Sequence, residues 1–119
     1  MAVEAGERLL HIKRTIGLIR TLLAGLTIDD LKSGPHVRAA FERYLEIISE
    51  ASRHIPEPWR LSLAPDLPWR PIANLGNVLR HAYEGVDVDI LWAVYEGELD
   101  QLEQAVDTML AAHPPKGAV

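Results

Sequence analysis

Apolar residues recur at steps of three and four along most of this chain, and polar residues fill the positions between them. The first such series predicts a helix from about Val3 to Ala24, with Gly25 as its left-handed cap. A period of 3.6 residues places these apolar positions on one face, which we expect to be buried. The series consists of Leu9, Ile12, Ile16, Ile19 and Leu23.

Two further segments in the first half of the chain are also expected to be helical. Thr27 offers a hydroxyl cap and is followed by carboxylates, so a short turn of helix is expected from Thr27 to Ser33, before Pro35 interrupts it. A second long helix is predicted from about His36 to His54, and Pro56 stops it. Its apolar stripe consists of Val37, Phe41, Tyr44, Ile48 and Ala51.

The second half of the chain predicts two more long helices. One starts near Trp69, tolerates Pro71 in its first turn, where a missing N–H has no partner, and ends at Gly85. Asp87 is a suitable N-cap for the other helix, from Val88 to about Ala112. The stripe of this last helix leaves two positions open, and it comprises Leu91, Val94 or Tyr95, Glu98 or Leu99, Leu102, Val106 and Met109.

Together these segments predict an all-α fold, an antiparallel four-helix up-and-down bundle with an extra short helical turn or two. Residues 55–68 are rich in proline and are expected to form a loop with one helical turn around Trp59 to Leu63. We expect Trp59 and Trp69 to fix this loop onto the bundle. The predicted domain covers residues 1–112, and residues 113–119 are expected to be a flexible tail.

Composition limits the possible functions. With 119 residues, of which 48% are hydrophobic, the chain suits one compact domain, and the absence of cysteine excludes thiolate chemistry and disulfides. No apolar run approaches the roughly 20 residues that span a bilayer, and the first residues lack the basic start of a signal peptide, so we expect a cytoplasmic protein. A formal charge of -5 disfavours nucleic-acid binding through bulk electrostatics, although a local basic cleft is compatible with it.

The histidines fall into two groups. His81 lies one helical turn after Asn77 on the same face of the third predicted long helix, whose apolar stripe is Trp69, Ile72, Leu75 and Leu79. Taken alone, a histidine near a helix C-terminus can simply be a side chain that the helix dipole favours, and this interpretation stays open. The others have no second ligand at a metal-like spacing, so we expect solvated side chains and no metal site at His11, His36, His54 and His113.

Two sequence blocks together resemble the HepT-like family of HEPN domains. The family has Ile-Ile-Gly-Glu-Ala in its second long helix, where this chain has residues 47–51 with Ser49 in place of glycine. In its third long helix the family has Trp-x-x-Ile-x-x-Met-Arg-Asn-x-x-x-His-x-Tyr, where this chain has Trp69 to Tyr83. The resemblance extends over nearly the whole chain, and the combined spacing is far more specific than a lone His-x-Tyr.

The resemblance implies the toxin of a type VII toxin–antitoxin system, which cleaves RNA as a metal-independent endoribonuclease and needs no cofactor. Its expected partners are a second copy of the chain in a homodimer, RNA, and a MntA-like nucleotidyltransferase antitoxin, but no DNA and no membrane. RNA cleavage without metal requires a base, an acid and a cation that stabilises the phosphorane. By resemblance, His81 is the proton-transfer residue and Asn77 orients the substrate or the imidazole, and a two-fold dimer provides two copies of His81.

One position departs from the family pattern in a way that concerns catalysis. The family's arginine stands immediately before the asparagine, where this chain has Gly76. Loss of a charged transition-state contact costs rate factors of about a hundred to a thousand. Arg80 lies one turn further on and can lean toward the vacated space, because helical side chains tilt toward the N-terminus. The alternative, which we favour at this point, is an ordinary solvated or salt-bridged surface arginine.

Two hypotheses of different classes follow. The first is a HEPN ribonuclease toxin, active or attenuated; the second is a catalytically silent HEPN protein that is the substrate or binding partner of a nucleotidyltransferase. Glycine at position 76 favours the second, so we expect cleavage to be weak or absent and Gly76→Arg to increase it. In the family the tyrosine of the His-x-Tyr ending accepts AMP from the antitoxin, which by resemblance assigns this modification to Tyr83. The alternative role of that tyrosine is ring packing at a helix end.

Overall fold

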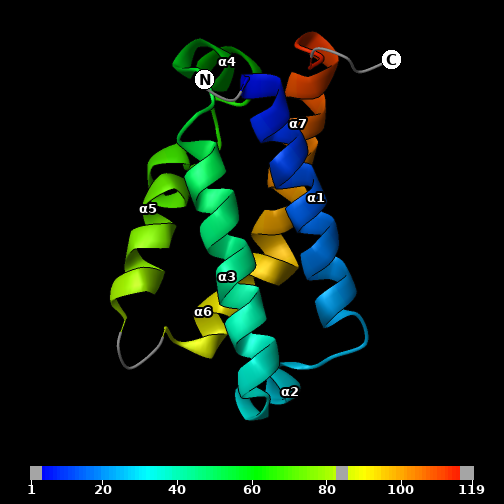
Figure 1. Ribbon diagram of the computed structural model, residues 1–119, viewed down its shortest axis with the longest axis vertical. Helices are drawn as coiled ribbons and strands as arrows, with labels where there is room; N and C mark the ends of the chain where they lie inside the picture. Colours follow the sequence, from blue (N-terminus) through cyan, green and yellow to red (C-terminus); the bar gives the residue numbers. More distant parts are fainter. Residues whose placement is uncertain (1–3, 83–85, 116–119) are drawn as a thin grey trace.

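The computed structural model describes residues 4–82 and 86–115, and this part of the chain contains helices and no strand (Figure 1). The expectation of an all-α helical bundle is confirmed. In Figure 1, α3 lies between α5 on one side and α1 on the other. The elements are α1 (Ala5–Leu23), α2 (Ile28–Ser33), α3 (Pro35–Ser52), α4 (Glu57–Leu63), α5 (Trp69–His81), α6 (Val88–Ala93), η1 (Val94–Glu98) and α7 (Leu99–Ala112).

Local chemistry explains several helix boundaries. Gly25 has a φ of 76°, the left-handed conformation that ends α1 as expected. The side chain of Thr27 accepts a hydrogen bond from the backbone N–H of Asp30, and the carboxylate of Asp30 accepts one from the backbone N–H of Thr27, so α2 begins with a capping box. The carboxylate of Asp87 accepts from the backbone N–H of Asp89 at 2.8 Å and caps α6. All three caps were predicted from the sequence.

The core lies where α1, α3 and α7 meet. The apolar stripe predicted for α1 is fully buried, with relative exposures of 0–1% from Leu9 to Leu23. Phe41 of α3 is also fully buried, and its ring meets that of Tyr95 edge-on with centroids 6.5 Å apart. Burial of this apolar surface provides the main driving force for folding. The other most deeply buried side chains include Leu31, Leu91, Leu99, Val106 and Met109.

The last long helix is interrupted by one wide π-helical turn, η1, in which the N–H of Leu99 bonds to the carbonyl of Val94. The sequence predicted a continuous helix from Val88 and left open whether Glu98 or Leu99 faces the core. The extra residue in the wide turn resolves this choice, because Leu99 is 2% exposed whereas Glu98 is exposed to solvent. A regular helix with Glu98 at the core position would bury an unpaired carboxylate, which is costly.

The end of the bundle near both termini is closed by aromatic and proline contacts. Trp59 of α4 stacks on His113, with ring centroids 3.8 Å apart and an interplanar angle of 3°. This confirms that Trp59 fixes the loop onto the bundle, and it corrects the expectation that His113 is simply solvated. Pro115 is buried and lies directly against Gly6 of α1. The domain boundary at residue 112 stays a prediction, and residues 116–119 lie outside the described residues.

Ion pairs on the surface join α1 to α7. Arg20 contacts the carboxylates of Asp100 at 2.6 Å and Glu103 at 3.1 Å. Lys13 pairs with Asp107, whose hydrogen bond raises the pKa of the lysine. Exposed pairs of this kind contribute little to stability individually. Within residues 4–82 and 86–115, no helix combines the length and apolar character that crossing a membrane requires.

Candidate functional site on helix α5

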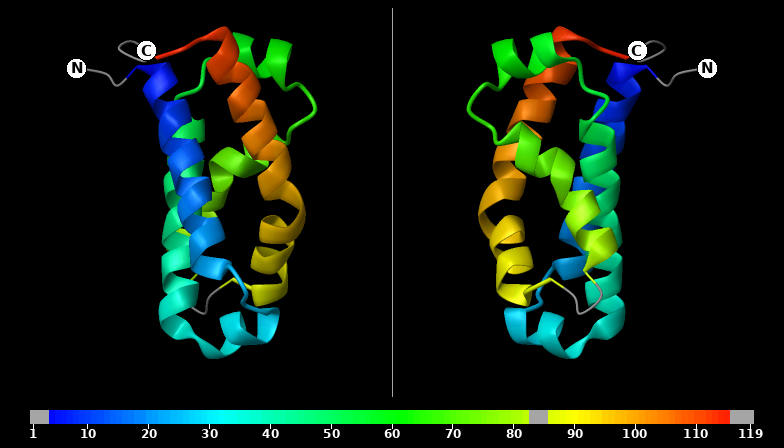
Figure 2. Two further views of the ribbon diagram at one scale, coloured as in Figure 1. Left: turned by 90° about the vertical axis from the view of Figure 1, so that its right-hand side faces the viewer. Right: turned by 90° about the vertical axis from the view of Figure 1, so that its left-hand side faces the viewer.

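Helix α5 has one face against the bundle and one toward solvent, and it lies nearest the viewer in the right-hand view of Figure 2. Its neighbour is α3. Trp69 and Leu79 are buried, and the other two residues of the predicted stripe are partly buried against the core. The indole N–H of Trp69 donates to the carbonyl of Ala64 at 2.8 Å, which fixes the start of the helix. The opposite face of α5 is therefore available for chemistry.

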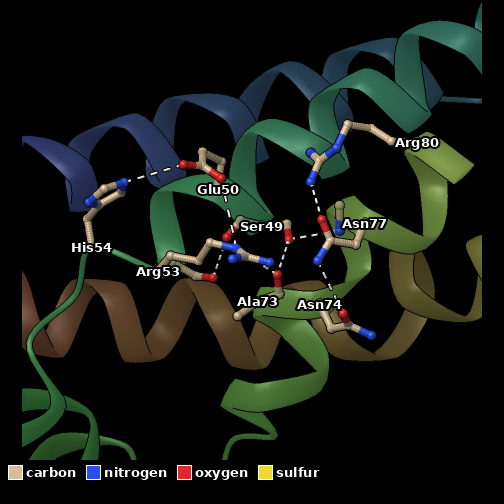
Figure 3. Close-up of polar contacts among 10 residues, drawn as sticks. Ser49, Glu50, Arg53, His54, Ala73, Asn74, Asn77 and Arg80 are labelled. Atoms are coloured by element: carbon tan, nitrogen blue, oxygen red, sulfur yellow. Dashed lines mark hydrogen bonds and ion pairs between the residues drawn. The ribbon is translucent and has the colours of Figure 1, made fainter.

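Two of the predicted site residues contact each other on this outer face (Figure 3). The guanidinium of Arg80 donates to the amide oxygen of Asn77, and the amide nitrogen of Asn77 lies 3.4 Å from the side-chain oxygen of Asn74. Among the described residues, Arg80 forms no ion pair with a carboxylate. Among these residues the guanidinium is held by the neutral amide of Asn77, which leaves its charge uncompensated.

The guanidinium of Arg80 also lies directly beside Gly76. A Cβ atom built on Gly76 would stand 3.2 Å from Nη1 of Arg80, so the two positions share one space. From the sequence, Arg80 had two interpretations: a side chain that extends toward position 76, and an ordinary surface arginine, which was favoured. The observed position agrees with the first. The contact supports that interpretation, because the charged group lies where a side chain from position 76 would begin.

Gly76 is buried against α3 through a contact that the sequence did not predict. The hydroxyl of Ser49 accepts a hydrogen bond from the backbone N–H of Gly76 at 2.9 Å and donates to the carbonyl of Ala73 at 3.0 Å. A Cβ on Gly76 would lie 3.0 Å from the Ser49 oxygen and 3.3 Å from its Cβ, closer than the roughly 3.5 Å of ordinary packing. The departures from the family pattern at positions 49 and 76 therefore touch each other.

Removal of the Ser49 hydroxyl tests this link between the helices. Ser49→Ala is expected to lower the free energy of unfolding by about 1 kcal/mol, because a buried hydroxyl that serves both a donor and an acceptor is lost. Urea unfolding monitored by circular dichroism measures the effect. The matched control is Ser33→Ala, whose hydroxyl bonds to the carbonyl of Asp29 at 3.0 Å but is exposed to water. Equal effects in both variants would contradict a special role for Ser49.

His81 is the last residue of α5 and is exposed. It lies one turn after Asn77, and no hydrogen bond to its side chain is present among the described residues. Where the described chain resumes, the carbonyl of Val86 accepts a hydrogen bond from the guanidinium of Arg38 in α3. Tyr83 and the predicted cap Gly85 lie outside the described residues. The imidazole of His81 is thus exposed at the end of α5, next in sequence to Arg80.

Two recesses border α5. One, of about 640 Å³, is lined mainly by apolar residues of α3, α5, α6, η1 and α7, and none of Asn77, Arg80 and His81 lines it. A smaller open recess of about 560 Å³ lies on the outer side, at the start of α5. No group of three or more His, Asp or Glu side chains in the described part of the chain is placed to hold a metal ion.

Comparison with known proteins adds an independent observation. The family model described as "Ribonuclease HepT-like" matches residues 12–109. A protein of Thermococcus cleftensis named "Probable ribonuclease HepT" is 36% identical over 77% of this chain and 83% of its own length. A protein of Caldanaerobacter subterraneus subsp. tengcongensis, named as a "Putative RNase", is 32% identical over 84% of this chain and 88% of its own. No solved structure matches the chain significantly.

Proposed function

Because this chain belongs to the HepT-like ribonuclease family of HEPN domains, we propose that it is a metal-independent endoribonuclease, attenuated by the loss of the arginine at position 76, and the toxin of a type VII toxin–antitoxin system. The observation that carries the proposal is the position of the Arg80 guanidinium. It contacts Asn77 and lies beside Gly76, the position at which the family's arginine starts. A cation, an amide and His81 thus occupy one exposed end of one helix.

These groups match the needs of RNA cleavage by internal attack of the ribose 2′-hydroxyl. His81 takes the proton from this hydroxyl as the oxygen attacks phosphorus, and a protonated histidine gives a proton to the leaving 5′-oxygen. The products are a 2′,3′-cyclic phosphate and a free 5′-hydroxyl. Arg80 faces the phosphorane oxygens as a fixed positive charge, and Asn77 holds its guanidinium in place. Attenuation follows because Arg80 starts one turn away from the position of the missing arginine.

The scheme needs a base and an acid at the same time, and one chain offers one histidine at this end of α5. A two-fold homodimer, with α5 of each copy facing the other, supplies both. The test is a cleavage assay on single-stranded RNA in excess EDTA, after light scattering has established the oligomeric state. We expect a dimer and slow formation of cyclic-phosphate ends. A strictly monomeric protein, or cleavage that EDTA abolishes, would contradict the proposal.

The alternative is a catalytically silent HEPN protein that a MntA-like nucleotidyltransferase modifies at Tyr83. Gly76 favours it, because glycine provides no phosphate contact of its own. Incubation of the chain with such a transferase and ATP is expected to add one AMP to Tyr83, measured by mass spectrometry of the intact protein and of its peptides. The phosphodiester forms between the tyrosine oxygen and the α-phosphorus, and pyrophosphate leaves. Tyr83→Phe is the control, and modification that persists in this variant would place the acceptor elsewhere.

A further inference from the structure

Polar side chains continue along the outer face of α5, away from His81. Arg70, Asn74, Asn77 and His81 follow one another at steps of four, three and four residues, which places them on one side of the helix. Asn74 and Asn77 are joined through their side chains. Helix α5 contains no acidic residue, although the chain as a whole carries a formal charge of -5. This face is therefore locally positive.

Two arginines lie close together at the end of this row that is far from His81. Arg70 and Asn74 line the open recess of about 560 Å³ together with Arg53, the residue that follows α3. Arg53 donates through Nε to the carbonyl of Ala73 at 3.1 Å, and this bond holds its guanidinium against α5 (Figure 3). Arg70 is exposed and forms no ion pair with any described residue.

One carboxylate competes for this recess. Glu50 lies 3.9 Å from Nε of Arg53, and its other oxygen lies 3.4 Å from Nε2 of His54. The Glu50 side chain is 56% exposed, so its interaction with Arg53 is screened by water. Both arginines retain N–H groups for an anion, because a guanidinium has five N–H donors and Arg53 uses only Nε in the bond to Ala73.

We propose that Arg53, Arg70 and Asn74 form a second phosphate-binding site, which holds the RNA backbone at a nucleotide remote from the one that is cut. Guanidinium groups suit phosphate because they form bidentate, charge-assisted hydrogen bonds. Arg70 and His81 are separated by eleven steps along the helix, which at about 1.5 Å per residue corresponds to about 16 Å. Neighbouring phosphates of one strand lie much closer together than this, so a phosphate in this recess is not the phosphate that is cut.

The site rests on the proposed ribonuclease function, but its test does not require cleavage. The probe is a ten-nucleotide single-stranded RNA with 2′-O-methyl groups throughout, which cannot be cut through a 2′-hydroxyl. Binding is measured by fluorescence anisotropy over a range of salt concentrations. Arg70→Gln is expected to weaken binding about tenfold at low salt and to reduce the salt slope by about 0.7, the value for one phosphate contact on a single strand. Arg53→Gln acts in the same direction, and Glu50→Gln strengthens binding.

The control is Arg14→Gln, which removes an exposed arginine of α1, on the other side of α3 from α5. It is expected to leave binding unchanged. If Arg70→Gln and Arg53→Gln bind the decamer as the unmodified protein does, the site is wrong. If millimolar inorganic phosphate displaces the decamer completely, the recess is a site for free phosphate. This result also contradicts the proposal that it binds the RNA backbone. If the variants weaken binding but the unmodified protein cuts no RNA, the recess stands and the ribonuclease proposal fails.

Discussion

Replacement of His81 by alanine is expected to reduce RNA cleavage by about a hundred- to ten-thousandfold, the usual contribution of a positioned general acid or base. In the proposed dimer both the base and the acid are copies of this residue, so one substitution removes both. The side chain is exposed at the end of α5, so its loss leaves the core packing unchanged. Cleavage of a fluorescently labelled RNA measures the effect, and urea unfolding verifies the fold.

The matched control is His11→Ala, which removes an exposed histidine of α1. It is expected to cleave RNA at the rate of the unmodified protein. Urea unfolding is expected to show that both variants are folded. The binding of the 2′-O-methyl decamer is expected to change little in His81→Ala, because the proton-transfer step does not contribute to ground-state affinity. Cleavage by His81→Ala at the unmodified rate would place the proton-transfer group elsewhere in the chain.

The fold could be predicted because its signals are local and repeated. The stripe of α1 contains five apolar residues at helical spacing, and the caps at Gly25 and Asp87 depend only on near neighbours. The π-helical turn could not be predicted in this way. Whether Glu98 or Leu99 faces the core depends on how η1 packs in the bundle, for instance through the contact of Tyr95 with Phe41 of α3, which is a tertiary contact. His113 was misjudged for the same reason, because Trp59 is far away in the sequence.

The candidate site was predicted less completely than the fold. Sequence spacing placed Asn77 and His81 on one face, since both belong to one helix. It could not decide between the two interpretations of Arg80, because the choice depends on the rotamer of a long side chain. The contact between Ser49 and Gly76 joins two helices and has no signature in local spacing. One signal was present, however: both residues depart from the family pattern, which could have suggested that they meet.

The contact between Ser49 and Gly76 changes the expected result of placing the family's arginine at position 76. Gly76→Arg alone brings a new Cβ within 3.0 Å of the Ser49 hydroxyl, so the two helices must separate slightly or Ser49 must change rotamer. We expect a modest gain in cleavage from this single variant. The double variant Ser49→Gly, Gly76→Arg removes the obstruction and restores both family residues. Its cleavage rate is expected to exceed that of the unmodified protein about a hundredfold, the typical value of one charged transition-state contact.

Arg80 provides the test of mechanism in this series. If its guanidinium substitutes for the missing arginine, Arg80→Ala is expected to reduce cleavage in the unmodified protein and to have little effect in the double variant, where the restored side chain takes over the phosphate. The cycle consists of the unmodified protein, the double variant, and each of these two with Arg80→Ala added. From their cleavage rates we expect a coupling free energy well above zero, because both guanidinium groups compete for one space. Ser49→Gly alone is the control and leaves the rate unchanged. A double variant no more active than the unmodified protein would show that position 76 does not limit catalysis, and equal losses from Arg80→Ala in both backgrounds would assign Arg80 a role independent of that position.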